Sequence, residues 1–158
     1  MTIAVDMEIR ISLLQAVQAV LFFSLLIAVS AWDLRYRIIP DRFQGGIALL
    51  SFLNFAPGQL LGALGAVPYL IVALFCKREG GMGGGDIKLA GATGLVLGLP
   101  ASLTASCLGL TGFVMYGCMV CLWNRFKGKR DKEAFPVGPF LAGGAAAVYC
   151  MRLGGWMI

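Results

Sequence analysis

Two aspartates, Asp33 and Asp86, are the residues in this chain best suited to chemistry. Each lies at one end of a long apolar stretch, where a carboxylate costs free energy unless it is hydrated or paired. If the two stretches pack together, the carboxyls can share one proton, so that one acts as an acid and the other as a base toward water. The alternative is that each aspartate only marks a helix end. The chain contains no histidine, which excludes imidazole acid–base chemistry and His-ligated metal sites.

The other acidic residues have simpler explanations. Five of them lie in polar segments with other charges or close to the N-terminus: Asp6, Glu8, Glu79, Asp131 and Glu133. Asp41 lies in a basic turn, where we expect it to act as an N-cap or turn residue for the helix that follows. A shared-proton pair of Asp33 and Asp86 would have the chemistry of an aspartic peptidase.

A glycine-rich segment directly precedes Asp86 and strengthens its candidacy. Five of the six residues at 80–85 are glycine. Glycine permits unusual backbone angles and close approach of another chain, and such a segment at membrane depth is tolerated where it is buried in protein or lines a water-filled cavity. A phosphate-binding loop would require a GxxxxGK[ST] motif, which the chain lacks. The pattern predicts that Asp86 lies in a cavity.

The elements that position these aspartates are predicted to be membrane-spanning helices. Of the 158 residues, 59% are hydrophobic and 13% are charged, whereas a soluble domain has about 25% charged residues. Four apolar stretches occur, at 11–32, 43–75, 89–123 and 137–153, and the second and third are interrupted at Pro57-Gly58 and Gly98-Leu99-Pro100. Since about 20 residues cross a bilayer, we predict an all-α integral membrane protein with six transmembrane helices in a single domain, 1–158.

The basic residues predict the orientation of these helices. The loops after the first, third and fifth predicted helices hold 11 of the 13 Lys and Arg, and only Arg10 and Arg152 fall on the other side. Because cytoplasmic loops carry the excess of Lys and Arg, we expect both termini outside and both aspartates at the cytoplasmic face. The net charge of +5 is therefore a topology signal, with no indication of nucleic-acid binding.

Several small residues predict close helix packing within the membrane. Glycines recur at spacings that permit such contact, at Gly91, Gly94, Gly98, Gly109, Gly112, Gly143 and Gly144. Cys118 and Cys121 form a single pair within the fifth predicted helix, too few ligands for a structural zinc site. We interpret this pair as small apolar packing and predict no metal site.

Three segments together resemble the type IV prepilin peptidases, a family of polytopic GxGD-type aspartic proteases that includes preflagellin peptidases. The segment GGGDIKL at 83–89 is similar to the GxGDxKL signature of the family. The segment DLRYRIIPD at 33–41 resembles its first motif, and PVGPFLA at 136–142 resembles its C-terminal P-x-GPFLA segment. The three occur in order, and the resemblance extends over essentially the whole chain.

This resemblance implies a membrane endopeptidase that removes the short basic leader of prepilin, pseudopilin or Flp-like substrates at the cytoplasmic face of the inner membrane, without a cofactor. Asp33 and Asp86 correspond to the catalytic pair, and Gly83, Gly85, Lys88 and Pro139 are further motif or substrate-contact candidates. For Lys88 the alternative is an ordinary charge of a cytoplasmic loop. The sequence makes no prediction of the oligomeric state.

The chain differs from the larger, bifunctional members of the family. Those members carry an N-terminal extension with paired CxxC motifs, associated with zinc and with N-methylation of the mature pilin, whereas only ten residues precede the first apolar stretch here. We therefore expect a peptidase-only form without the extension, in which methyltransferase activity is doubtful.

Three alternatives stay open beside the prepilin peptidase. A small proton-coupled transporter or channel would use the aspartates as proton carriers, an inactive pilus-assembly scaffold would leave them unexplained, and a preflagellin-type peptidase would share the motifs. Within the peptidase hypothesis, helix dipoles suggest roles for the pair. Asp33 ends a helix and would hold the shared proton, whereas Asp86 begins one and would act as the base.

Overall fold

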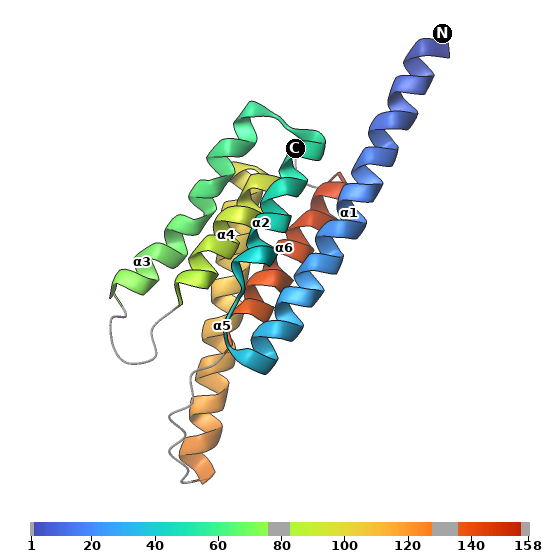
Figure 1. The fold of residues 1–158 in the computed structure, drawn as a ribbon. Coiled ribbons are helices and arrows are strands. Elements are labelled where there is room, and N and C mark those ends of the chain that lie inside the picture. Colours follow the sequence, from blue (N-terminus) through green and yellow to red (C-terminus); the bar gives the residue numbers. More distant parts are fainter. Residues whose placement is uncertain (1, 76–82, 128–135, 156–158) are drawn as a thin grey trace.

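The computed structural model shows a bundle of helices (Figure 1). It describes residues 2–75, 83–127 and 136–155, and every regular element in these ranges is helical. The α-helices are α1 (Thr2–Tyr36), α2 (Asp41–Leu50), α3 (Val67–Phe75), α4 (Gly84–Leu97), α5 (Leu99–Lys127) and α6 (Gly138–Leu153). Two 3₁₀ helices, η1 (Ser51–Asn54) and η2 (Pro57–Ala66), continue α2 and lead into α3.

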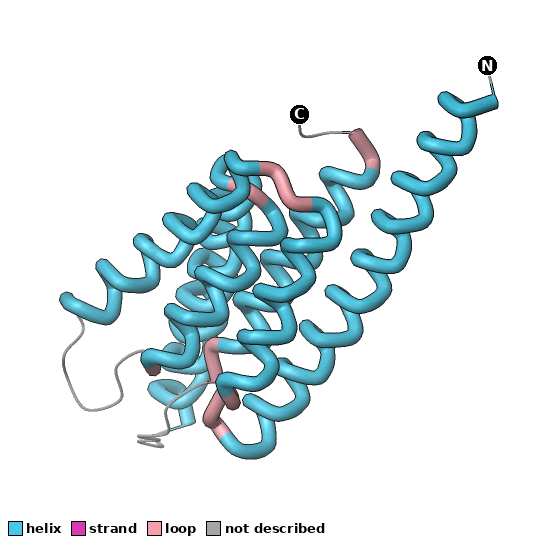
Figure 2. Tube along the Cα trace, turned by 45° about the horizontal axis from the view of Figure 1, so that its top comes forward, coloured by secondary structure: helices cyan, strands magenta, loops and turns pink. Residues whose placement is uncertain are grey.

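The helices run up and down, so that their ends gather at two opposite ends of the bundle (Figures 1 and 2). One end collects the C-terminus of α1 and the first turns of α4 and α6, and we call it the aspartate end. The other end collects the turn between η1 and η2, the junction of α4 and α5, and the C-terminus of α6. We call it the distal end.

Among the described residues, three apolar helical segments are long enough to cross a membrane, as expected for an all-helical membrane protein. They are Ser12–Tyr36, Pro57–Phe75 and Leu99–Lys127, with 25, 19 and 29 residues. Helices α2, α4 and α6 have 10, 14 and 16 residues, fewer than the roughly 17–25 of a typical span. The count of six spans and the location of the termini stay predictions.

Both predicted interruptions are present. The chain turns after Asn54, and Pro57 begins η2, a position where proline loses nothing because its missing N–H would have no intrahelical partner. Helix α4 ends before Gly98, whose φ of +81° is in the region that favours glycine. The long apolar stretches therefore fold into hairpins at these two turns.

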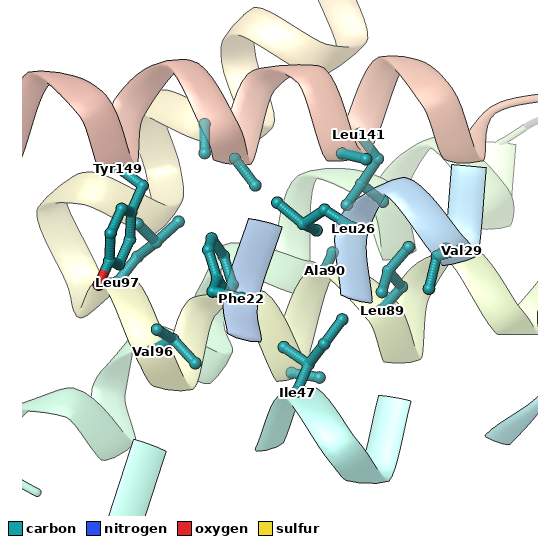
Figure 3. Packing of buried hydrophobic residues seen from close by; sticks show 14 of the residues in the cluster. Phe22, Leu26, Val29, Ile47, Leu89, Ala90, Val96, Leu97, Leu141 and Tyr149 are labelled. Atoms are coloured by element: carbon teal, nitrogen blue, oxygen red, sulfur yellow. The ribbon is translucent and has the colours of Figure 1, made fainter. Parts of the chain in front are cut away.

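The core lies where α1, α2, α4 and α6 meet. Figure 3 shows Phe22, Leu26 and Val29 of α1 directed between α6 on one side and α4 and α2 on the other. All three side chains are almost fully buried. Helix α4 is the most enclosed element, and its buried residues are Asp86, Leu89, Ala90, Ala92, Thr93, Gly94, Val96 and Leu97. The helix that carries Asp86 is thus held from several sides.

Close packing occurs at some of the predicted glycines but not at all of them. A Cβ at Gly94 would collide with the carbonyl of Gly62, and one at Gly144 would meet the Ala105 carbonyl at 2.5 Å. Such contacts draw η2 onto α4 and α5 onto α6. In contrast, a Cβ at Gly143 or Gly98 would meet nothing within 4 Å.

Two expectations about individual residues are wrong. Cys118 and Cys121 are exposed free thiols and do not pack inside the bundle. They belong to the C-terminal half of α5, the end of which extends beyond the other helices (Figure 1). The N-cap of α2 is Pro40, and Asp41 is the first residue of the helix. Most of the two later basic loops lies outside the described residues.

Candidate functional site

Asp33 is buried in the last turn of α1, with a side chain that is only 5% exposed. Its Oδ2 accepts a hydrogen bond of 2.9 Å from the backbone N–H of Gly138, the first residue of α6. This bond joins residues 105 positions apart in the chain. The first turn of a helix has N–H groups without intrahelical partners, and here one of them is satisfied by the aspartate.

Gly138 allows this contact because it has no Cβ. A Cβ at this position would lie 2.7 Å from Oδ2 of Asp33 and 3.0 Å from its Cγ. Both distances are shorter than the 3.5–4.0 Å at which nonbonded carbon atoms pack best. The sequence comparison with the C-terminal motif pointed to Pro139, and the neighbouring glycine is the residue that contacts the aspartate.

Asp86 is buried in the first turn of α4 and is 8% exposed. Its Oδ2 accepts a 3.2 Å hydrogen bond from the N–H of Gly83, while its own N–H donates to the Gly83 carbonyl at 3.0 Å. A carboxylate three residues into a helix commonly reaches back in this way to an N–H at the helix start. The end of the glycine-rich segment therefore fixes Asp86 locally.

The structure brings the two aspartates to the same pocket. A cavity of about 260 Å³ is lined by Asp33, Arg37, Ile38, Ile39, Gly83, Gly84, Gly85 and Asp86. Two carboxylates that line one pocket repel one another when both are ionised, which favours a single proton on the pair. This geometry agrees with the predicted cavity at the glycine-rich segment, although the catalytic role of the pair stays a prediction.

Gln44 of α2 supports the wall of this pocket and was missed from the sequence. It is 5% exposed, and its Nε2 donates to the carbonyl of Gly85 at 3.2 Å and to that of Ile39 at 3.5 Å. Both acceptors belong to pocket-lining residues. A polar residue in an otherwise apolar stretch was the available signal, but its partners are backbone atoms that no side-chain pattern reveals.

Of the remaining sequence candidates, Gly83 and Gly85 line the pocket, whereas Lys88 and Pro139 do not. Lys88 forms an exposed ion pair with Asp41, with a distance of 3.1 Å from Nζ to Oδ1. A Cβ at Gly85 would lie 3.3 Å from Cβ of Ile39, so glycine permits close contact between the two pocket walls. Pro139 lines a separate apolar groove of about 410 Å³ between α1 and α6.

The structure also changes the argument from helix dipoles. Asp33 is near the C-terminus of α1, but it meets the N-terminus of α6 through Gly138. Asp86 lies at the N-terminus of α4. Each aspartate is thus adjacent to the positive end of a helix dipole. The difference in dipole environment from which Asp33 was predicted to be the acid and Asp86 the base is therefore smaller than the sequence suggested.

Within the described ranges, no three Cys, Asp or Glu side chains gather in a way that could hold a metal ion. What the site offers chemically is a pair of buried carboxyls on a pocket with room for several water molecules. The described fold and site are thus those of an all-helical membrane protein with two buried carboxyls, one from α1 and one from α4, on a single pocket. Comparison with known proteins specifies the class further: residues 20–123 match the type IV leader peptidase family, and the chain belongs to this family.

Several bacterial proteins named prepilin leader peptidase/N-methyltransferase are similar to this chain. The chain is 33% identical over 144 residues to a prepilin leader peptidase/N-methyltransferase of Bacillus subtilis, covering 86% of this chain and 56% of that protein. It is 32% identical over 155 residues to one of Dickeya chrysanthemi, covering 87% and 52%. The chain spans about half the length of these curated relatives. No solved structure matches it.

Proposed function

We propose that this protein is a membrane aspartic endopeptidase that removes the short basic leader from type IV prepilin-like proteins. The observation that carries the proposal is the placement of Asp33 and Asp86, both buried, on one pocket. Membership of the leader peptidase family supports the peptidase over the transporter or channel alternative. The names of the relatives support a prepilin-like substrate.

The proposed reaction uses the two carboxyls as one unit with a single proton. The ionised carboxyl removes a proton from a water molecule, whose oxygen attacks the scissile carbonyl carbon, while the protonated carboxyl donates its proton to the carbonyl oxygen. When the tetrahedral intermediate collapses, the C–N bond breaks and a proton passes to the leaving amine. Because the two groups titrate together, we do not divide the roles of acid and base between them.

The backbone contacts support this chemistry by fixing each carboxyl. Asp33 is held by the N–H of Gly138, and Asp86 by the N–H of Gly83. Each of these bonds uses one carboxyl oxygen, Oδ2, and the proposal assigns the other oxygen, Oδ1, to water or substrate. Positioning of this kind reduces the reorganisation that the reaction would otherwise require.

The charge distribution supports cleavage at the cytoplasmic face. Six of the eight described Lys and Arg belong to helix ends or turns that lie at the aspartate end, namely the end of α1 and the turn after it, the starts of α2 and α4, and the end of α5 (Figure 1): Arg35, Arg37, Arg42, Lys88, Arg125 and Lys127. Arg10 belongs to the N-terminal part of α1 and Arg152 to the end of α6, which lie toward the distal end. By the excess of basic residues in cytoplasmic segments, the aspartate pocket would open toward the cytoplasm of a cell whose inner membrane holds the protein.

The test is cleavage of a prepilin-type substrate, with a basic leader ending in glycine before an apolar helix, in membranes that contain wild type, Asp33→Asn or Asp86→Asn. Both variants should be inserted and inactive, because the asparagine amide cannot act as acid or base. Asp41→Asn is the matched control, since Asp41 is an exposed aspartate at the same end. If either pocket variant retains wild-type cleavage, the paired mechanism is wrong.

A further inference from the structure

The distal end contains two adjoining cavities that the proposed peptidase reaction does not use. One, of about 290 Å³, is lined mainly by polar side chains: Gln15, Gln18, Asn54, Gln59, Tyr149 and Arg152. The other, of about 390 Å³, is lined mainly by apolar residues of the junction between α4 and α5: Leu97, Leu99, Pro100 and Ala101. Ala56, Gln59 and Arg152 line both cavities. A polar chamber thus adjoins an apolar one, with these three residues between them.

Arg152 is positioned where the two chambers meet. Its Nη1 donates to the carbonyls of Val96 and Leu97, each at 3.2 Å, which holds the guanidinium against the C-terminus of α4. A guanidinium has five N–H groups, so further donors remain for a ligand. None of the described residues that line either chamber is acidic. The positive charge therefore lacks a carboxylate partner in these walls.

The polar chamber offers additional hydrogen-bond donors. Gln59 is 7% exposed, and its Oε1 accepts the N–H of Ala56 at 3.2 Å, which leaves its Nε2 as a donor on the walls of both chambers. Gln18 is held in place by its bond to the Leu50 carbonyl and by the amide of Asn54. An arginine with neighbouring amide donors is a suitable arrangement for phosphate oxygens.

We propose that this distal site binds an anionic phospholipid, with its phosphate at Arg152 and Gln59 and part of an acyl chain in the apolar chamber. A free phosphate ion would use only the polar chamber, whereas a phospholipid accounts for both. If the basic residues orient the chain as proposed above, the lipid comes from the leaflet that faces away from the cytoplasm. The site is separate from the aspartate pocket, because its lining residues include the junction of α4 and α5 and the end of α6, which lie at the end of the bundle opposite to the C-terminus of α1 (Figure 1).

The test is native mass spectrometry of the delipidated full chain with dioleoyl phosphatidylglycerol, and with dioleoylglycerol as a matched lipid that lacks the phosphate. Wild type should bind the phosphatidylglycerol about tenfold more tightly, as expected for a charge-assisted hydrogen bond. Arg152→Gln should remove this preference. Arg10→Gln is the control, because Arg10 is a basic residue on the same side that lines neither chamber.

A second variant tests the apolar chamber without altering Arg152. Thr104 lines this chamber, and its hydroxyl bonds only to carbonyls of its own helix. Thr104→Phe should weaken the binding of both lipids by narrowing the space for an acyl chain. Equal binding of the two lipids by wild type would overturn the proposal. Unaltered lipid binding by Thr104→Phe would overturn it as well, and this variant still provides a test if Arg152→Gln does not fold. Full displacement of the lipid by inorganic phosphate would instead indicate a free-anion site and refute the lipid assignment.

Discussion

Replacing Gly138 with alanine should disable the aspartate pocket through a single added methyl group. The new Cβ would lie 2.7 Å from Oδ2 of Asp33 and 3.0 Å from its Cβ and Cγ. Nonbonded carbons pack best at about 3.5–4.0 Å, so the carboxyl and the start of α6 must separate by roughly 0.5–1 Å. The 2.9 Å bond from Gly138 N–H to Oδ2 would be lost or stretched.

The size of the effect follows from that bond. A hydrogen bond to a charged group contributes about 1.5–3 kcal/mol, and each 1.36 kcal/mol of lost transition-state stabilisation is a tenfold loss of rate. If the bond holds Asp33 in its reactive position, kcat should fall between about tenfold and 150-fold. A displacement near 1 Å can reduce rates about 100-fold through misalignment alone, so the two estimates agree. KM should change little, because the substituted atom does not line the pocket.

Gly143→Ala is the matched control for this experiment. Gly143 lies in the same helix, and a Cβ there would meet nothing within 4 Å. Both substitutions add a methyl group and raise helix propensity, so they differ mainly in the contact with Asp33. The assay is prepilin cleavage in detergent or nanodiscs, with kcat and KM measured separately and the melting temperature measured on the same samples.

The reasoning is refuted if Gly138→Ala cleaves within about twofold of Gly143→Ala while both variants are folded. A parallel loss of melting temperature and activity would instead show that the methyl group disrupts the packing of α6 as a whole.

Three further predictions concern packing, charge and pH. Gly94→Ala should destabilise the fold by about 1–3 kcal/mol, because its Cβ would collide with the Gly62 carbonyl. Gly91→Ala is the control and should leave the melting temperature almost unchanged, because the nearest atom to its Cβ lies at 3.8 Å. Equal losses of melting temperature in the two variants would contradict the close contact at Gly94. A double-mutant cycle on Lys88 and Asp41, both well exposed, should give a coupling below about 1 kcal/mol that declines with salt, and a larger coupling that persists in salt would show a structural role. Cleavage should depend on pH with a bell shape, because activity requires one proton on the aspartate pair, and a profile that stays flat across the pH range would argue against a shared proton.

The sequence predicted the parts of this structure that depend on composition and chain direction. Apolar stretches of sufficient length identified the three long helices, and Pro57 and Gly98 identified the turns, because their backbone constraints are local. The common location of Asp33 and Asp86 followed from counting helices: an odd-numbered helix ends at the face where an even-numbered one begins. Each of these inferences needs only the order of the residues.

Predictions of what each side chain contacts were less successful for a physical reason. In a membrane protein, apolar residues are favourable both inside the bundle and against lipid, so hydropathy does not distinguish the two faces. Cys118 and Cys121 were accordingly interpreted as packing residues, although both are exposed. Gln44 could not be assigned because its acceptors are the carbonyls of Ile39 and Gly85, which every residue possesses.

Glycine shows most clearly where the information in the sequence ends. Gly138 and Gly143 are five positions apart in one helix, and nothing in the surrounding letters distinguishes a glycine required by contact from one with open space. The difference is made by α1, which places Asp33 against the first turn of α6 and leaves Gly143 uncovered. Since the requirement is imposed by a residue 105 positions away, only the packed structure reveals it. The helix that supplies Asp33 therefore also determines that Gly138 cannot be replaced without a clash, and this coupling is what the comparison of the two alanine variants measures.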